Sequence, residues 1–470
     1  MKNNLKLFSQ TLGYAQSKPY ILSGLLLLAV ITLYVGAMSA PFVFDDFTFF
    51  SNPEIMLKYG QGYFNFELRW LPYASLAQTT NWLGFDRSWL RLGNVLLHAA
   101  NAIALFFLLR RLFRVTLVGD AAPNGISPVL TGFAFFGALI FALHPVTVYG
   151  VAYLIQRSTL MATLFTLLML LAYLEGLLPA PSPSKKQESE GAPLERRGSW
   201  RWMLVAAFCY FAAVYSKEHS ILAPGVALAL TLLIRKPSVG LLRQIAPYYI
   251  LAALIAATVI WSTISSKAVL GAVYEPNAGG MLEQGAKLQG LTDMPNLHWL
   301  SILTQCGLFF KYLGLWLLPN PGWMSVDMRE SFAMSLFSWP YSAGLIAFLG
   351  YFCGAVWLLL KRGSQGLLGF ALLFPWILFL AEWSTVRIQE PFVLYRSYLW
   401  MPGLFAALPL VFGWLAPKRA FMLLGAICLL LVPLTLNRLD TFSTPLKLWD
   451  DAEKLVRGKS GVVGVERIYT

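Results

Sequence analysis

The amino-acid sequence predicts an all-α protein that crosses a membrane many times. Only 13% of its 470 residues are charged and 57% are hydrophobic, whereas a soluble domain carries about 25% charge. Apolar runs recur along the chain, and the first is uncharged from Pro19 to Phe44, which is long enough to cross a bilayer. Because lipid forbids open sheet edges, these runs are expected to be helices.

The apolar runs also predict where the spans lie. Spans are expected near residues 20–40, 91–110, 127–144, 157–178, 201–216, 219–234, 246–265, 339–360, 366–382, 398–416 and 419–436. The run 301–319 is different, because a crossing there would put Lys361 and Arg362 on the outer side, against the positive-inside rule. It is therefore expected to be re-entrant or to lie along the outer face.

The net charge of +13 reflects membrane topology and not nucleic-acid binding. Basic residues cluster at the ends of apolar runs, and such ends are expected to be cytoplasmic. These clusters are Arg110-Arg111, Lys185-Lys186, Arg196-Arg197, Arg235-Lys236, Lys361-Arg362 and Lys418-Arg419. The pattern, without a targeting extension, fits a bacterial inner membrane.

The same topology divides the chain into a membrane domain, 1–436, and a short C-terminal segment, 437–470, on the periplasmic side. Long periplasmic segments are expected at about 41–90, 266–338 and 383–397. The polar, proline-rich stretch 179–200 is expected to be a disordered cytoplasmic linker.

Two adjacent carboxylates, Asp45 and Asp46, follow the first span directly. Ionisable groups at a membrane are costly, so this pair is a candidate for function. The alternative is a flank that only ends a helix. Carboxylates suit Mg²⁺ or Mn²⁺, but too few converge in the sequence to predict a metal site.

Further polar residues interrupt the apolar runs. Asn94, His98 and Asn101 share one helical face, which either looks into a cavity or forms hydrogen bonds between helices. His144 ends the third span and Arg157 begins the fourth. Lys217, Glu218 and His219 sit between the fifth and sixth spans, where a wet hairpin turn is the alternative. Arg387, Glu390 and Arg396 flank the third outer segment.

These residues place carboxylates and bases on one membrane face, while no nucleotide-binding loop is present. An enzyme at that face needs an activated donor presented from the lipid, and polyprenyl-phosphate sugars meet this need. The phosphate leaving group would be bound by Arg or Lys. The acceptor hydroxyl would give its proton to a carboxylate base.

The order of several short motifs resembles the transmembrane-and-TPR O-mannosyltransferase family, a branch of the GT-C glycosyltransferases, from about 42 to 455. The motifs are Phe-Val-Phe-Asp45-Asp46, 92–99, 141–146 with Arg157, Ser216-Lys217-Glu218, 311–327, 395–402 and 437–449. The resemblance implies a GT-C-like bundle of about 10–12 transmembrane helices. It also implies Asp45 or Asp46 as the acceptor-side base.

The resemblance further implies that Arg157, Lys217 and Arg396 bind the donor phosphate. The pocket would be shaped by Asn94, His98, His144, Glu218 and Tyr398. The chain departs from the family pattern in two places. It stops at Thr470, where the TPR array would begin, and it has Tyr395 where the family has Glu, a role that Glu390 or Glu382 could fill. A chain of this kind is also similar to bacterial pilin glycosyltransferases such as the type IV pilin arabinosyltransferase.

The sequence thus predicts a glycosyltransferase that moves a sugar from a polyprenyl-phosphate donor to a hydroxyl acceptor at the periplasmic face. A protein Ser or Thr, as in a pilin, is the preferred acceptor, and an envelope glycan or lipid is the alternative. A lipid-sugar transporter would also explain polar residues in the membrane. It predicts two matching halves, and the sequence shows no such internal symmetry. An assembly protein would leave the ordered motifs unexplained.

Overall fold

A computed structural model describes residues 18–61, 66–118, 127–178, 199–267, 297–388 and 390–456. Within these ranges the chain is helical and contains no β-strand, and an isolated bridge joins Met328 to Phe392. The all-α class is therefore confirmed. Much of the predicted linker 179–200, part of the second outer segment and the end of the C-terminal segment lie outside the described residues.

The described α-helices follow the apolar runs closely. They are α2 (Pro19–Tyr34), α3 (Asp45–Ser51), α4 (Pro53–Gln61), α5 (Trp70–Leu83), α6 (Arg87–Phe113), α7 (Pro128–Leu143), α8 (Val148–Val151), α9 (Arg157–Leu177), α10 (Ser199–Ser216), α11 (Ala223–Ile234), α12 (Val239–Lys267), α14 (Leu297–Leu317), α15 (Tyr341–Leu360), α16 (Gly363–Phe379), α17 (Ser397–Trp400), α18 (Leu408–Phe412), α19 (Pro417–Thr441) and α20 (Pro445–Val456). Short 3₁₀ helices complete the outer loops, among them η6 (Glu218–Leu222), η8 (Leu380–Ser384) and η9 (Leu394–Arg396).

Within the described part of the chain, 8 helices are long and apolar enough to cross a membrane, or up to 9 if the bent pair Pro128–Ala142 and Pro145–Val151 forms one span. The chain is thus a multi-pass membrane protein. Helices α10 and α11 match the predicted runs 201–216 and 219–234 but are not among these 8 helices. The stretch Glu218–Ile234, which contains α11, is apolar but shorter. The bend follows His144, at Pro145, whose ring cannot continue a helix.

One predicted span is not a continuous α-helix. The run 398–416 is divided into α17, the 3₁₀ helix η10 (Met401–Ala407) and α18. Pro402 and Pro409 each remove a backbone donor, which explains why the α-helix is interrupted.

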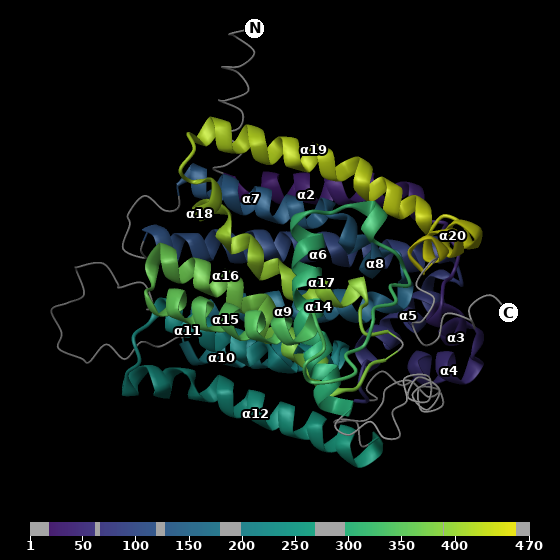
Figure 1. Cartoon of the computed structure of the whole chain (residues 1–470), viewed down its shortest axis with the longest axis horizontal. Helices are drawn as coiled ribbons and strands as arrows, with labels where there is room; N and C mark the ends of the chain where they lie inside the picture. Colours follow the sequence, from purple (N-terminus) through teal and green to yellow (C-terminus); the bar gives the residue numbers. More distant parts are fainter. Residues whose placement is uncertain are drawn as a thin grey trace, which may run out of the picture.

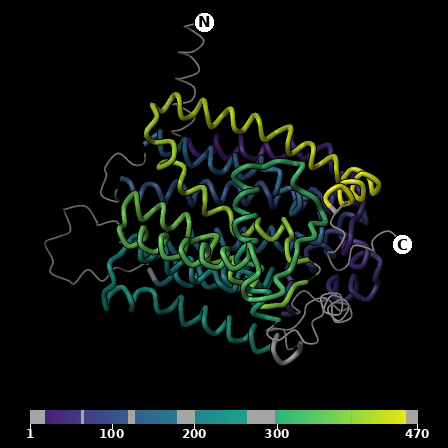
Figure 2. The backbone as a smooth tube through the Cα atoms, in the orientation of Figure 1, coloured from purple at the N-terminus to yellow at the C-terminus, as the bar shows by residue number. Residues whose placement is uncertain are grey.

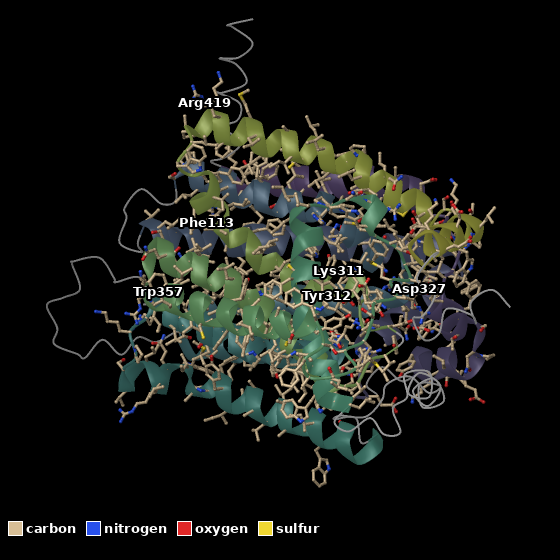
Figure 3. All side chains as sticks on the ribbon, in the orientation of Figure 1. Phe113, Lys311, Tyr312, Asp327, Trp357 and Arg419 are labelled. Atoms are coloured by element: carbon tan, nitrogen blue, oxygen red, sulfur yellow. The ribbon has the colours of Figure 1, made fainter. Side chains whose placement is uncertain are left out.

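The long helices α6, α7, α12, α15, α16 and α19 run in a common direction (Figure 1). The short helices α3 and α4, from the start of the chain, and α20, from its end, gather at one end of the bundle (Figure 2). Phe113, Trp357 and Arg419 lie toward the opposite end from Asp327 (Figure 3). The basic clusters next to these three residues therefore share one end, as the positive-inside rule requires.

Helix α14 contains the run that was expected to be re-entrant or to lie along the outer face. It is long and apolar enough to span a membrane, yet its ribbon runs crosswise to α6 and α19 (Figure 1). Its side chains Cys306, Phe309 and Tyr312 are buried in the protein. The crosswise direction favours a helix that lies along one face.

Candidate active site

The paired aspartates begin α3, where the chain turns sharply after the first span. Phe44 precedes them with a φ of 48°, a left-handed value that costs a non-glycine residue about 1–3 kcal/mol. Arg91 of α6 stabilises this turn. Its guanidinium donates hydrogen bonds to the backbone carbonyls of Met38, Ala40, Pro41 and Ala152. This clamp fixes the first outer segment against the loop that follows α8.

Asp46 is buried, with 0% of its surface exposed. Its carboxylate accepts hydrogen bonds from the backbone amides of Val43 (3.2 Å), Leu154 (3.4 Å) and Ile155 (2.9 Å). Burial raises the pKa of Asp46 to about 7, although these hydrogen bonds act in the opposite direction. Such a pKa would suit a general base, but a carboxylate enclosed by three amides cannot meet a substrate. Through these hydrogen bonds Asp46 holds the turn at Val43 against the loop at Leu154 and Ile155.

Asp45, by contrast, is exposed and lines a cavity of about 280 Å³. Its backbone amide donates to the Tyr153 hydroxyl at 3.1 Å, while its carboxylate makes no hydrogen bond or ion pair with any residue that the structure describes. Burial, with the Asp45 charge as a lesser cause, raises the pKa of Tyr153, so this phenol stays protonated. The structure therefore separates the two aspartates that the sequence left equivalent.

The cavity is lined by aromatic and acidic side chains from five segments of the chain. Asp327 and Glu390 add carboxylates to Asp45, and Asp327 is paired with Arg329 at 2.7 Å. The bridge between Met328 and Phe392 fastens the second outer segment to the third. The aromatic lining residues are Phe44, Tyr149, Tyr153, Phe392, Tyr395, Phe442 and Trp449.

A cationic cluster lies next to this cavity; we define it as Arg69, Lys217, Arg387 and Arg396. Its carboxylate partners are Glu382, which is 3.2 Å from Arg396 and 3.6 Å from Arg387, and Glu218, which accepts from Arg69 Nε at 2.9 Å. His219 bridges the two carboxylates, 3.0 Å from Glu382 and 3.6 Å from Glu218. Arg69 and Lys217 directly precede α5 and η6, Arg387 follows η8, and Arg396 is the last residue of η9.

Lys217 is the most informative member of the cationic cluster. It is 5% exposed, and among the described residues its ammonium donates to neutral oxygens alone, Gln156 Oε1 at 3.1 Å and Thr159 Oγ1 at 2.7 Å. Burial, followed by the nearby Arg69 charge, lowers the pKa of Lys217 to about 7. No carboxylate of the described residues contacts this ammonium, and one of its three N–H donors is left over beside the cavity wall, so an anionic ligand there would supply both an acceptor and a countercharge.

Tyr395 joins the cavity to the cationic cluster. Its ring lines the cavity, and the Lys217 ammonium lies 4.9 Å from the ring centroid. On the other side, the Tyr153 ring lies 6.1 Å from it. Arg396 also reaches the cavity wall by donating to the Glu390 carbonyl at 3.3 Å. The cavity with its acidic residues and the cationic cluster are thus connected through the rings of Tyr153 and Tyr395.

Other predicted site residues lie elsewhere, in a polar stripe inside the bundle, which we define as Asn94, His98, His144, Arg157 and Tyr398. Arg157 donates to the Asn94 side chain, the Leu90 carbonyl, Ser75 and Thr79. Asn94 in turn donates to the carbonyls of Val151 and Leu154. All three guanidinium nitrogens of Arg157 are used, so its surroundings give no support to the predicted phosphate contact.

The rest of the polar stripe is equally self-contained. His98 bonds to the Tyr398 hydroxyl at 2.7 Å and to the Ala142 carbonyl at 3.0 Å. His144 stacks on Trp316, with ring centroids 4.3 Å apart, and bonds to the Trp316 carbonyl. None of the five residues lines the cavity. Their contacts hold helices together, which is the alternative interpretation of the Asn94 face.

Sequence reasoning missed several parts of the site. Arg69 and Tyr153 received no role, and Glu382 was only a substitute candidate. Arg69 lies in an outer segment where a basic residue is ordinary, so no sequence signal distinguishes it. The charge of Glu382 inside an otherwise apolar run was a usable signal.

Within the described ranges, no group of three or more His, Cys, Asp or Glu side chains is placed to hold a metal ion. Comparison of the chain with protein-family models, curated proteins and solved structures finds no match in any of the three.

Proposed function

We propose that this chain is a membrane glycosyltransferase of the GT-C type that uses a polyprenyl-phosphate sugar as donor. The acceptor is a hydroxyl, preferably that of a protein Ser or Thr as in a pilin. The reaction takes place on the periplasmic side of a bacterial inner membrane. The observation that carries the proposal is that the Asp45 carboxylate, which has no partner among the described residues, is connected to the cationic cluster through the rings of Tyr153 and Tyr395.

The two halves of the site fit the two halves of the reaction. The acceptor hydroxyl attacks the anomeric carbon, and Asp45 takes its proton. The bond between that carbon and the phosphate oxygen breaks, and the electron pair leaves with the lipid phosphate. Lys217 and Arg396 stabilise the negative charge on the departing phosphate.

The location of the site supports the same reaction. Asp327 and Trp449 of α20 line the cavity, and Asp327 lies toward the opposite end of the bundle from Phe113, Trp357 and Arg419 (Figure 3). A polyprenyl phosphate keeps its tail in the bilayer and its phosphate at the surface. The cationic cluster is built from residues at helix ends, which supports binding of a phosphate that is held near the membrane surface.

The proposal is tested by transfer of a labelled sugar from polyprenyl phosphate to hydroxyl acceptors by the purified protein. Asp45→Asn is expected to lower kcat at least about a hundredfold, because a general base contributes about 10²–10⁴-fold, with the melting temperature unchanged. Asp46→Asn is the matched control. It is expected to lower the melting temperature, because hydrogen bonds to Val43 and Leu154 are weakened, while the folded fraction stays active.

Transfer that is unchanged in Asp45→Asn would contradict the assignment of the base. If wild-type protein transfers no sugar from any polyprenyl-phosphate donor but moves the labelled lipid across a vesicle membrane, the chain is a transporter instead.

A further inference from the structure

The outer wall of the cavity is formed by α20, the last described helix. Trp449 of α20 lines the cavity and meets Phe44 edge-to-face, with ring centroids 5.7 Å apart. Phe44 is the residue directly before Asp45. The two rings therefore border the side of the cavity on which the acceptor hydroxyl must approach the base.

A buried latch fixes α20 in this place. Arg438, at the end of α19, is 2.9 Å from the Asp451 carboxylate and donates to the Met324 carbonyl at 2.8 Å. Ser325 donates to the Asp451 carbonyl at 3.2 Å. Since the residues that follow Ser325 also line the cavity, the latch joins α20 to the neighbouring wall.

One face of α20 is buried against the protein and the other is exposed, as expected for a helix packed on a surface. Leu448, Asp451 and Ala452 are buried and lie on one helical face. Leu446 is 80% exposed, and Asp450 pairs with Lys454 at the surface. Trp449 is 40% exposed, since it borders an open cavity and is not packed into the core.

We infer that α20 selects the acceptor, and that Trp449 contacts an apolar or aromatic side chain next to the accepting Ser or Thr of a peptide. This inference rests on the proposed function, because it takes Asp45 to be the base. The donor phosphate is bound on the other side of Tyr395, so Trp449 acts on the acceptor and not on the lipid. A flat indole beside Phe44 offers a surface on which an apolar side chain can pack.

The test compares two short threonine peptides that differ only in whether Phe or Gly flanks the threonine. Wild-type protein is expected to prefer the Phe-flanked peptide about tenfold in kcat/KM. Trp449→Ala is expected to reduce this preference to about one, by raising the KM of the Phe-flanked peptide, and to leave the KM of the donor unchanged. Trp449→Phe should keep most of the preference, and Leu446→Ala, a surface control on the same helix, should keep all of it.

Because the readout is a ratio within each variant, partial loss of folded protein does not affect it. A preference that persists in Trp449→Ala, or its absence from wild-type protein, would overturn the inference. Transfer to glycan or lipid acceptors but to neither peptide would overturn the inference and leave the proposed function standing. Transfer to no acceptor at all would instead count against the proposed function.

Discussion

The polar stripe inside the bundle and the cationic cluster at its outer end contain similar residue types but differ in how their charges are satisfied. In the polar stripe, all three Arg157 nitrogens donate to protein oxygens, and His98 bonds at both of its ring nitrogens. In the cationic cluster, Lys217 contacts only neutral oxygens and faces a ring of the cavity wall. Both cations contact neutral oxygens of the described residues, so the difference lies in their surroundings. All three Arg157 nitrogens donate inside the bundle, whereas Lys217 uses two of its three N–H donors and lies beside the cavity wall, where the third is available for a ligand.

The largest expected effect is on the cationic cluster. Lys217→Met should lower the rate of transfer about 10²–10³-fold, as the loss of one preorganised charge at a leaving group does. The melting temperature should stay the same or rise, because the substitution removes a buried cation that no contacting carboxylate compensates. A transfer assay together with thermal unfolding measures both. Normal transfer by Lys217→Met would contradict the ligand-binding role of Lys217, and the cationic cluster would then not differ in function from the polar stripe.

The polar stripe should respond in the opposite way. Arg157→Met leaves Asn94 and the Leu90 carbonyl without a donor, and each buried group left unsatisfied costs about 1–3 kcal/mol. We expect a loss of about 2–4 kcal/mol in the free energy of unfolding. Specific activity per folded molecule should stay within about threefold of wild type. Denaturant unfolding, with activity normalised to folded protein, checks this pair of outcomes.

The sequence predicted the helices well because apolar runs of membrane length allow few alternatives. It could not separate Asp45 from Asp46, since the burial of Asp46 depends on the amides of Leu154 and Ile155, 108 and 109 residues away. The sequence also assigned Arg157 and Lys217 the same role, binding of the donor phosphate, because their surroundings cannot be read locally. Whether a cation is saturated depends on distant partners such as Ser75 and Gln156, which no local pattern contains.

A smaller, pH-dependent effect should follow from Lys217. Its pKa is lowered by burial from 10.5 to about 7, so the free enzyme loses this charge above neutral pH. The kcat/KM for the donor should therefore fall above about pH 7, by up to about tenfold per pH unit. Lys217→Arg stays protonated and should flatten the profile. A wild-type profile that is flat between pH 6 and 9 would contradict the role of this charge.

The same pKa has the opposite consequence for stability. Between about pH 7 and 10.5 the unfolded chain binds the Lys217 proton and the folded chain does not. The contribution of Lys217 to the free energy of unfolding therefore rises with pH across this window. Activity and stability should diverge there in wild type, and Lys217→Met should lose this part of the pH dependence of stability.

The smallest expected effect is again in the polar stripe. Tyr398→Phe removes the hydrogen bond to His98 while keeping the ring that packs against Phe141. We expect a loss of about 1 kcal/mol in the free energy of unfolding and no change in transfer. A large loss of transfer at unchanged stability would show that Tyr398 belongs to the active site.

The most direct measurement is binding of labelled polyprenyl phosphate to the purified protein, with Lys217→Met and Arg157→Met compared side by side. The account predicts that Lys217→Met binds at least about tenfold more weakly at an unchanged melting temperature. Arg157→Met should bind like wild type once corrected for its folded fraction. Wild-type affinity in Lys217→Met, together with lost affinity in folded Arg157→Met, would contradict the account and place the phosphate inside the bundle.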